Sequence, residues 1–436
     1  MRPRCKSHHQ IVSTFPFPDW VLFEHRVAKI LTEQKIYGWS FNERLAQQLT
    51  STLLEELHQL EKVLLRRYPY VPGGEFTPKR DNKTSGYIKG ATFTRLKDTN
   101  IKSRDHVAWI LTEEARKKDE KAPTKKTEKG KIIIDETVLK EIGSETSMLF
   151  LRCLKVTKML GMISEGANAW LKLSTKSRIH HHCCVNTNTH RAIHKSPNLA
   201  QTPHEPEYRQ LFTASDGLVM VGADLSSIEL KLLAHYLARW SNDFANDLLH
   251  GDIHQITADR IGVTRRQIKT ITYGWMYGQS NTGLGLSYDE TLSKTKATKK
   301  GAEIREAFVK AIPGLEQLQA AVNKAAERGY IESLDGRKIY VDSKHKCLNY
   351  ILQSAAAIIS RRWLLINYDT IQQLNIPHAH QLAYIHDELQ WECPPNYAND
   401  LSTSLTVSAA AAGEYYNLRV PIEAEAKVGS NWAEVH

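Results

Sequence analysis

Residues 265–278 read RRQIKTITYGWMYG, and the interpretation of the whole chain depends on this segment. Arg265, Lys269, Tyr273 and Tyr277 recur at intervals of four, which places them along one face of a helix. Two cations lie at one end of this stripe and two aromatic rings at the other. Such a face suits a nucleotide, with phosphates on the cations and a base or sugar on the rings. The alternative is a solvated helix whose tyrosines pack on a neighbour.

Two acidic residues follow a short apolar run upstream of this helix. Residues 218–223, LVMVGA, are typical of a buried strand, and Asp224 comes directly after them. A carboxylate at the end of a strand is a suitable ligand for a hard cation such as Mg²⁺. Ser226 and Glu229 have the spacing of a capping box, so Glu229 is either a structural cap or part of a site.

A second acidic group lies downstream. Residues 382–385 and 389–393 are predicted to form a hairpin with His386, Asp387 and Glu388 at its turn. Adjacent carboxylates repel each other unless a cation or solvent intervenes. Carboxylates from two strand ends can hold two divalent ions for phosphoryl transfer. The alternative is a polar surface turn.

The charge of the chain is concentrated in one segment. The 436 residues carry a formal net charge of +10, which hints at a polyanionic partner. Residues 61–130 hold 18 Lys and Arg against 10 Asp and Glu and show little periodicity. They are interpreted as a long basic loop or small subdomain. This segment is either a solvated linker or a contact surface for nucleic acid.

Several classes of protein are disfavoured. No stretch approaches the about 18 apolar residues of a membrane-spanning helix. No P-loop, nucleophile elbow or His-Glu-x-x-His motif is present. Residues 180–184, HHHCC, hint at a metal, but neighbouring strand residues point to opposite faces, which disfavours zinc. Six cysteines without a C-x-x-C pair favour a reducing, intracellular setting.

The N-terminal part is predicted to be helical. Apolar residues at three- and four-residue spacing over 19–66 indicate two helices separated by Gly38. Ser40 or Asn42 is a candidate cap for the second helix. Residues 146–171 show a further helical pattern.

Taken in this order, the segments resemble the polymerase motifs of family A DNA polymerases, with single-chain phage replicases the most similar. Residues 224–231 resemble the first motif, residues 265–278 the fingers-helix motif and residues 386–388 the third motif. The following segments are similar to parts of the family that face DNA or nucleotide: Arg191 with 196–203, 251–254, 334–338 and 348–354.

The resemblance implies an α+β right-hand polymerase fold with an antiparallel-sheet palm, helical fingers and a helical thumb. Residues 1–180 are expected to form the thumb, with the basic loop at about 61–130. Residues 181–245 and 331–436 are expected to form the two parts of the palm, and residues 246–330 the fingers. This length leaves no room for a 3′–5′ exonuclease domain, so we expect proofreading to be absent or supplied by another chain.

The resemblance also implies an activity and its metal ions. The expected enzyme is a DNA-directed DNA polymerase of viral DNA replication, in the cytoplasm of the host cell. Asp224, Asp387 and the carbonyl of Leu225 are implied to hold two Mg²⁺ ions, with Mn²⁺ as a substitute. Glu388 is implied to lie beside them as a further catalytic residue, and Lys269 is implied to donate a proton to pyrophosphate.

The implied partners are primer–template DNA and dNTPs, with a separate exonuclease or processivity factor as a further candidate and no membrane. The implied nucleotide-binding residues are Arg265, His254, Tyr273, Glu229, Tyr277 and Gly278. The implied DNA-binding residues are Arg191, Asn349, Gln353, His386 and Arg337. Two alternatives stay open: a single-subunit RNA polymerase, against which Glu229 and Glu388 argue, and a catalytically silent DNA-binding protein.

Overall fold

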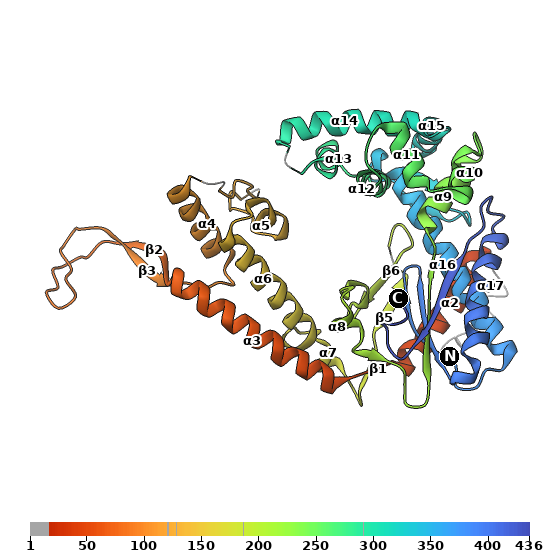
Figure 1. Cartoon of the computed structure of the whole chain (residues 1–436), viewed down its shortest axis with the longest axis horizontal. Helices are drawn as coiled ribbons and strands as arrows, with labels where there is room; N and C mark the ends of the chain where they lie inside the picture. Colours follow the sequence, from red (N-terminus) through yellow and green to blue (C-terminus); the bar gives the residue numbers. More distant parts are fainter. Residues whose placement is uncertain (1–16, 120–121, 128, 186, 291) are drawn as a thin grey trace, which may run out of the picture. The chain divides into compact units, whose positions relative to one another are not determined.

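The computed structural model describes residues 17–119, 122–127, 129–185, 187–290 and 292–436 (Figure 1). The chain divides into two compact units, of which the smaller is Asn42–Ser174 and the larger contains the rest. Each unit has its own core. No described helix has both the length and the apolar character needed to cross a membrane.

An antiparallel sheet lies at the centre of the larger unit. Its strand order is β11 (His380–Ile385), β12 (Glu388–Cys393), β8 (Val219–Leu225) and β13 (Ala424–Gly429). The predicted strand and hairpin are therefore confirmed. Because β8 extends to Leu225, Asp224 lies within the strand rather than after it.

Four helices accompany this sheet. They are α2 (Asp19–Tyr37), α9 (Ile228–Leu237), α16 (Cys347–Leu374) and α17 (Ala398–Tyr415). α16 and α17 pack against each other, and Trp363 of α16 donates its indole N–H to the carbonyl of Leu405 at 2.8 Å. α17 also packs on β8 and β13. The core thus fixes β8, which carries Asp224.

A group of shorter helices gathers at one end of the larger unit (Figure 1). They are α10 (Asp243–His250), α11 (Ile253–Ile261), α12 (Arg265–Met276), α13 (Asn281–Tyr288), α14 (Lys294–Ala311) and α15 (Leu315–Ala326). α12 begins with a capping box between Thr264 and Gln267. Gly301 lets α13 and α14 approach closely, since a Cβ there would lie 1.7 Å from the carbonyl oxygen of Asn281.

Small sheets complete the larger unit. They are β4–β1–β7 (Arg178–Ile179, Trp39–Phe41, Phe212–Thr213), β5–β6 (His182–Val185, Ala192–Lys195) and β9–β10 (Tyr330–Glu332, Lys338–Tyr340). The described part of the larger unit also contains four single-turn helices: η2 (Leu199–Gln201), α8 (Pro206–Arg209), η3 (Lys344–Lys346) and η4 (Pro395–Tyr397).

The smaller unit consists of helices and one hairpin. Its elements are α3 (Glu43–Arg67), β2 (Tyr70–Phe76), β3 (Phe93–Asp98), α4 (Arg104–Lys118), α5 (Glu136–Ile142), α6 (Glu145–Leu160), η1 (Gly161–Glu165) and α7 (Trp170–Leu173). The two helices predicted around Gly38 are confirmed. Asn42, rather than Ser40, caps the second by accepting a hydrogen bond from the Leu45 amide at 2.9 Å.

The lack of periodicity predicted for residues 61–130 is wrong in part. Residues 104–118 form α4, in which Val107, Ile110 and Leu111 are buried at three- and four-residue spacing. The basic residues around them obscured this pattern. By contrast, every residue of β3 is exposed, so neither face of this strand is buried.

Candidate active site

Asp224 and Asp387 are brought together by neighbouring antiparallel strands. Asp224 pairs with Glu388 between β8 and β12, and the amide of Leu225 donates to the carbonyl oxygen of Asp387 at 3.0 Å. Burial, and next the charge of Asp224, raise the pKa of Asp387 to about 7. Desolvation, and next the charge of Glu388, raise the pKa of Asp224 to about 6. The site therefore concentrates negative charge that a cation would neutralise.

The donor atoms at this position fit a hard divalent cation. Two carboxylates and the nearby carbonyl of Leu225 are oxygen ligands, which Mg²⁺ prefers. In the described part of the chain, no group of three or more His, Cys, Asp or Glu side chains is arranged to hold a metal ion. The protein would thus supply two carboxylates, and the remaining ligands would be carbonyl, water or substrate oxygens.

Glu388 lies within a strand, so its predicted place at the hairpin turn is wrong. It is the first residue of β12 and is 5% exposed. Its carboxylate accepts hydrogen bonds from Gln390 at 2.6 Å and Trp432 at 2.5 Å, and pairs with His436 at 3.4 Å. Burial acts to raise the pKa of Glu388, but the hydrogen bond from His436 and other partners leave it lowered. The ionised carboxylate ties the end of the chain to the sheet.

The predicted stripe on α12 is present. Arg265 and Lys269 are exposed and Tyr273 is half-buried beside the buried residues of the helix, and Tyr277 caps its C-terminus. The ring of His254 lies 6.2 Å from that of Tyr273. Burial lowers the pKa of His254, and the cations Arg265 and Lys269 lower it further. The side chains expected to meet a triphosphate therefore converge.

One interaction in this group was not apparent from the sequence. The Nε of Arg265 donates to Asp252 at 2.6 Å, and the same carboxylate caps α11 through the amides of His254 and Gln255. The single carboxylate of Asp252 thus both orients Arg265 and caps the start of α11.

Glu229 connects α12 to the carboxylates. The hydroxyl of Tyr277 donates to Glu229 at 2.9 Å. The capping-box interpretation is wrong, because α9 begins after Ser227 with no side-chain cap, and the amide of Ser226 donates to the carbonyl of Glu423. Burial, and next the charge of Glu229, raise the pKa of Tyr273. Glu229 therefore faces the site.

The residues expected to contact DNA divide into two groups. Arg191 and His386 line one crevice together with Glu229 and Asp387. Gln353 is half-buried one turn along α16 from Asn349. Asn349 is 9% exposed and donates to the carbonyl of Met276 at 2.9 Å, which joins α16 to the end of α12.

Arg337 is not brought to this crevice. It is 6% exposed and forms ion pairs with Asp335 at 2.5 Å and Glu24 at 2.6 Å. Its guanidinium is an internal tie between α2 and the β9–β10 hairpin. A sequence separation of 313 residues between Arg337 and Glu24 hid this partnership.

His194 was missed by the sequence analysis. It is 5% exposed on β6, and its ring meets that of His386 edge to face at 5.2 Å. The hydroxyl of Ser360 donates to the backbone carbonyl of His386. Nothing but its position three residues after Arg191 in the sequence signalled this contact. The nearby His180 and His181 turn to separate partners, the carbonyl of Lys35 and the side chain of Gln34.

Comparisons with known proteins agree with one another. The model of the family "DNA polymerase family A" matches residues 76–434. The chain is 29% identical to a DNA-directed DNA polymerase of Enterobacteria phage T3 and 28% identical to one of Escherichia phage T7; each alignment covers 95% of this chain and 69% of the relative. The POL domain of Pol1 from M. smegmatis, solved with DNA primer-template and dNTP, matches with a TM-score of 0.75 and 21% identity, over 94% of this chain and 70% of that chain.

Proposed function

The chain belongs to DNA polymerase family A and carries out template-directed DNA synthesis, and from this premise we propose that Asp224 and Asp387 are its metal-binding catalytic carboxylates. The observation that carries this proposal is geometric: Asp224 on β8 lies beside the β11–β12 turn that holds Asp387, and the amide of Leu225 donates to the carbonyl of Asp387. Burial raises the pKa of both carboxyls, and the charge of Asp224 raises that of Asp387 further. Such a pair is costly without a cation and well suited to two-metal phosphoryl transfer.

In the proposed reaction, the primer 3′-hydroxyl attacks the α-phosphate of the incoming dNTP, and pyrophosphate leaves. Mg²⁺ bound by Asp224, Asp387 and the Leu225 carbonyl would stabilise the attacking and leaving oxygens. Lys269 and Arg265 bind the triphosphate, and Lys269 donates a proton to the leaving pyrophosphate.

Glu229 is proposed to select the sugar. Its carboxylate is held by the hydroxyl of Tyr277, and its charge acts on Tyr273. A side chain fixed in this way would exclude a ribose 2′-hydroxyl by occupying the space that the hydroxyl needs. Gly278, with a φ of +73°, ends α12 and lets the chain turn beside the proposed templating position. Arg191, His386, Asn349 and Gln353 are proposed to meet the primer–template, and Arg337 supports them indirectly.

Primer extension with Mg²⁺ and either dNTPs or NTPs tests this function. We expect extension with dNTPs to be at least about 10²-fold more efficient, since a fixed carboxylate rejects an additional hydroxyl that it cannot accommodate. Equal or better use of NTPs would favour an RNA polymerase. Binding of DNA without extension by either substrate would favour the silent DNA-binding protein.

The units can be assigned to the parts of a polymerase hand. We propose that the thumb is the smaller unit, Asn42–Ser174, which is narrower than the expected 1–180 because the described residues before Asn42 and after Ser174 belong to the larger unit. We propose that residues 246–330 are the fingers and that residues 181–245 and 331–436 are the palm. The central antiparallel sheet and the helical group that carries α12 support this assignment.

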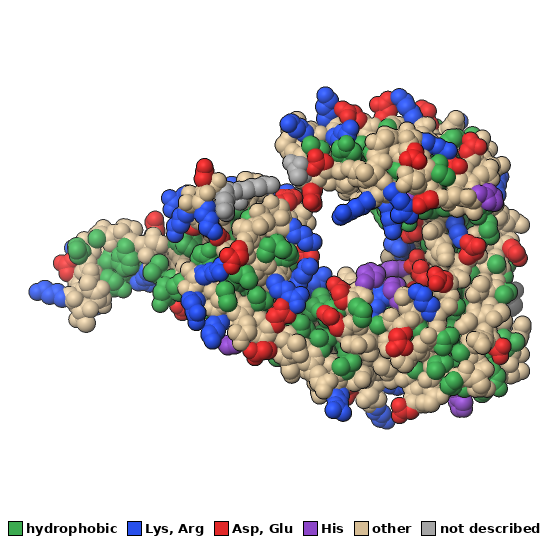
Figure 2. Space-filling view, viewed as in Figure 1, with side chains coloured by type: hydrophobic (Ala, Val, Ile, Leu, Met, Phe, Trp, Pro, Cys, Tyr) green, Lys and Arg blue, Asp and Glu red, His purple; other side chains and the backbone are tan. Residues whose placement is uncertain are grey.

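The β2–β3 hairpin is proposed to grip the DNA backbone. The segment from Tyr68 to Ser103, here called the arm, holds seven Lys and Arg against three Asp and Glu. Figure 2 shows positive charge at the far end of this arm. The guanidinium of Arg95 lies 3.7 Å from the ring centroid of Phe76, and this cation–π contact joins β3 to β2. The exposed cations remain available to phosphates.

Neutralising this arm should weaken binding of primer–template. With Lys79, Arg80, Lys83 and Lys89 changed to Gln, we expect the slope of log affinity against log salt to fall by roughly one for each phosphate that the arm no longer neutralises. Fluorescence anisotropy at several salt concentrations measures both quantities. Glu75→Gln is the matched control and should strengthen binding slightly. Unchanged affinity and slope in the fourfold variant would show that the arm does not contact DNA.

A further inference from the structure

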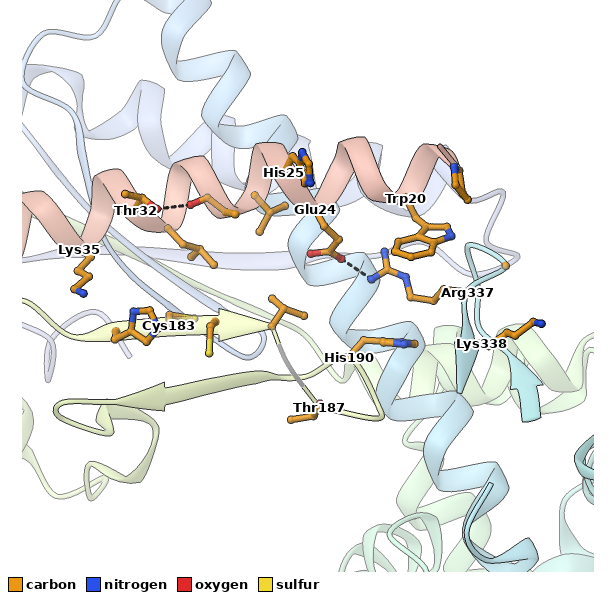
Figure 3. Close-up of a pocket in the computed structure, with 18 of the residues that line it drawn as sticks. Trp20, Glu24, His25, Thr32, Lys35, Cys183, Thr187, His190, Arg337 and Lys338 are labelled. Carbon is orange, nitrogen blue, oxygen red and sulfur yellow. Dashed lines mark hydrogen bonds and ion pairs between the residues drawn. The ribbon is translucent and has the colours of Figure 1, made fainter. Parts of the chain in front are cut away.

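A groove of about 1040 Å³ runs beside α2 in the larger unit, and no function above uses it (Figure 3). One stripe of α2 lines it from Trp20 through Ala28 to Lys35, and the β9–β10 hairpin closes one end. It shares no lining residue with the crevice that contains Arg191 and Asp387. The groove is therefore separate from the polymerase site.

The groove follows the edge of strand β5. All four residues of β5, His182–Val185, line it, whereas none of β6 does. Successive side chains of a strand point to opposite faces, so a groove above one face would meet only alternate residues. β5 pairs with β6 alone in the described part of the chain, so its other edge has no strand partner there. Its outward backbone groups can accept another strand.

The walls of the groove are mostly apolar. Val27 and Leu31 of α2 and Cys183 of β5 form a buried floor, with 1%, 5% and 6% of their surfaces exposed. Trp20 and Tyr340 stand at one end, and Tyr340 is 69% exposed. An occupant could therefore bury apolar side chains between α2 and β5.

The charges of the groove favour an anionic occupant. Its one lining acid, Glu24, is bound by Arg337 at 2.6 Å and Arg361 at 2.9 Å. Lys35 and Lys338 lie at opposite ends of the groove in Figure 3. Neither has an ion-pair partner among the residues that the structure describes. Two separated cations with an apolar centre suit a peptide better than a nucleic acid, whose charge is continuous.

We propose that this groove binds an extended segment of a partner protein, added to β5 as a third strand. The segment would have apolar side chains at alternate positions, directed between α2 and β5, and a carboxylate near each end to meet Lys35 and Lys338. Main-chain hydrogen bonds to β5 would supply affinity, and the alternating side chains would supply specificity. Because the polymerase site shares none of these residues, docking leaves it open.

Selection of peptides on the full chain tests the proposal. A display library of random nine-residue peptides is the probe, and selected peptides are then measured by fluorescence anisotropy. We expect enrichment of alternating apolar residues flanked by Asp or Glu. Ala28→Arg, which fills the groove from an exposed helix position, should weaken binding by tenfold or more, and so should Lys35→Glu combined with Lys338→Glu.

The control is Ile36→Arg, a change of similar size on α2 at a residue that is 73% exposed and does not line the groove. It should leave peptide binding unchanged, and both Ala28→Arg and Ile36→Arg should retain primer extension. No enrichment, or enrichment that survives Ala28→Arg, would overturn the proposal. Binding of a labelled oligonucleotide that disappears in Ala28→Arg would make the groove a nucleic-acid site instead. Binding of a synthetic peptide of residues 5–16, abolished in the same variant, would assign the groove to the chain's own N-terminal segment.

Discussion

Asp224→Asn and Asp387→Asn are each expected to lower Mg²⁺-dependent primer extension by about 10³-fold or more, since loss of a single electrostatic group already costs about 10²–10³ and each Asp here would hold metal ions. Asn keeps the size of the side chain, so the β8–β12 pairing that joins these positions should persist. Extension is measured in single turnover at saturating dNTP. Primer–template affinity, measured in parallel, should change little.

The same variants carry a second signature that a simple folding defect would not give. Both carboxyls have pKa values raised in the folded chain, to about 6 and about 7. An acid with a raised folded pKa binds more protons folded than unfolded, so stability falls as pH rises from about 4 to 7. At pH 8 without metal, Asp387→Asn should therefore melt at a higher temperature than the wild type.

The matched control for both measurements is Glu425→Gln. Glu425 pairs with Asp224 between β13 and β8, but it is not among the charges that raise the pKa of Asp224. It should retain extension within about threefold. Full activity of either Asn variant, or a loss in Glu425→Gln as large as theirs, would remove Asp224 and Asp387 from the proposed metal site.

Local signals in the sequence were enough to predict the elements that carry the chemistry. The apolar run before Asp224 predicted β8, and the spacing from Arg265 to Tyr277 predicted the exposed face of α12. Each depends on residues a few positions apart, whose periodicity directly reflects which face is buried. The order of these motifs was sufficient to indicate the family.

Side-chain contacts between residues far apart in the sequence could not be predicted from local patterns. Glu388 is held by Trp432, which lies 44 residues away, and Arg337 by Glu24, 313 residues away. Neither pairing leaves a local pattern in the sequence. Glu388 was therefore predicted to lie at a turn, and Arg337 was expected to contact DNA. His194 was missed for the same reason, since its contact with His386 joins two separate hairpins.

Lys269→Ala is expected to slow nucleotide incorporation by about 10²–10³-fold, the range for loss of one preorganised charged group. Lys269 lies one turn from both Arg265 and Tyr273 on the exposed face of α12, and its ammonium has no ion-pair partner in the described residues. Its charge is therefore free for the triphosphate. Arg266→Ala is the control, because Arg266 is an exposed cation on the same helix outside the stripe.

Lys269→Arg separates the two roles proposed for this side chain. Arginine keeps the positive charge but does not release a proton in proteins, so it can bind phosphates without donating to pyrophosphate. We therefore expect dNTP affinity to recover in Lys269→Arg while the single-turnover rate stays low. Recovery of both the affinity and the rate would show that Lys269 only binds phosphate, and that solvent supplies the proton to pyrophosphate. An equal loss in Arg266→Ala would contradict the stripe itself, because the whole charge of the helix, rather than one face, would then be responsible.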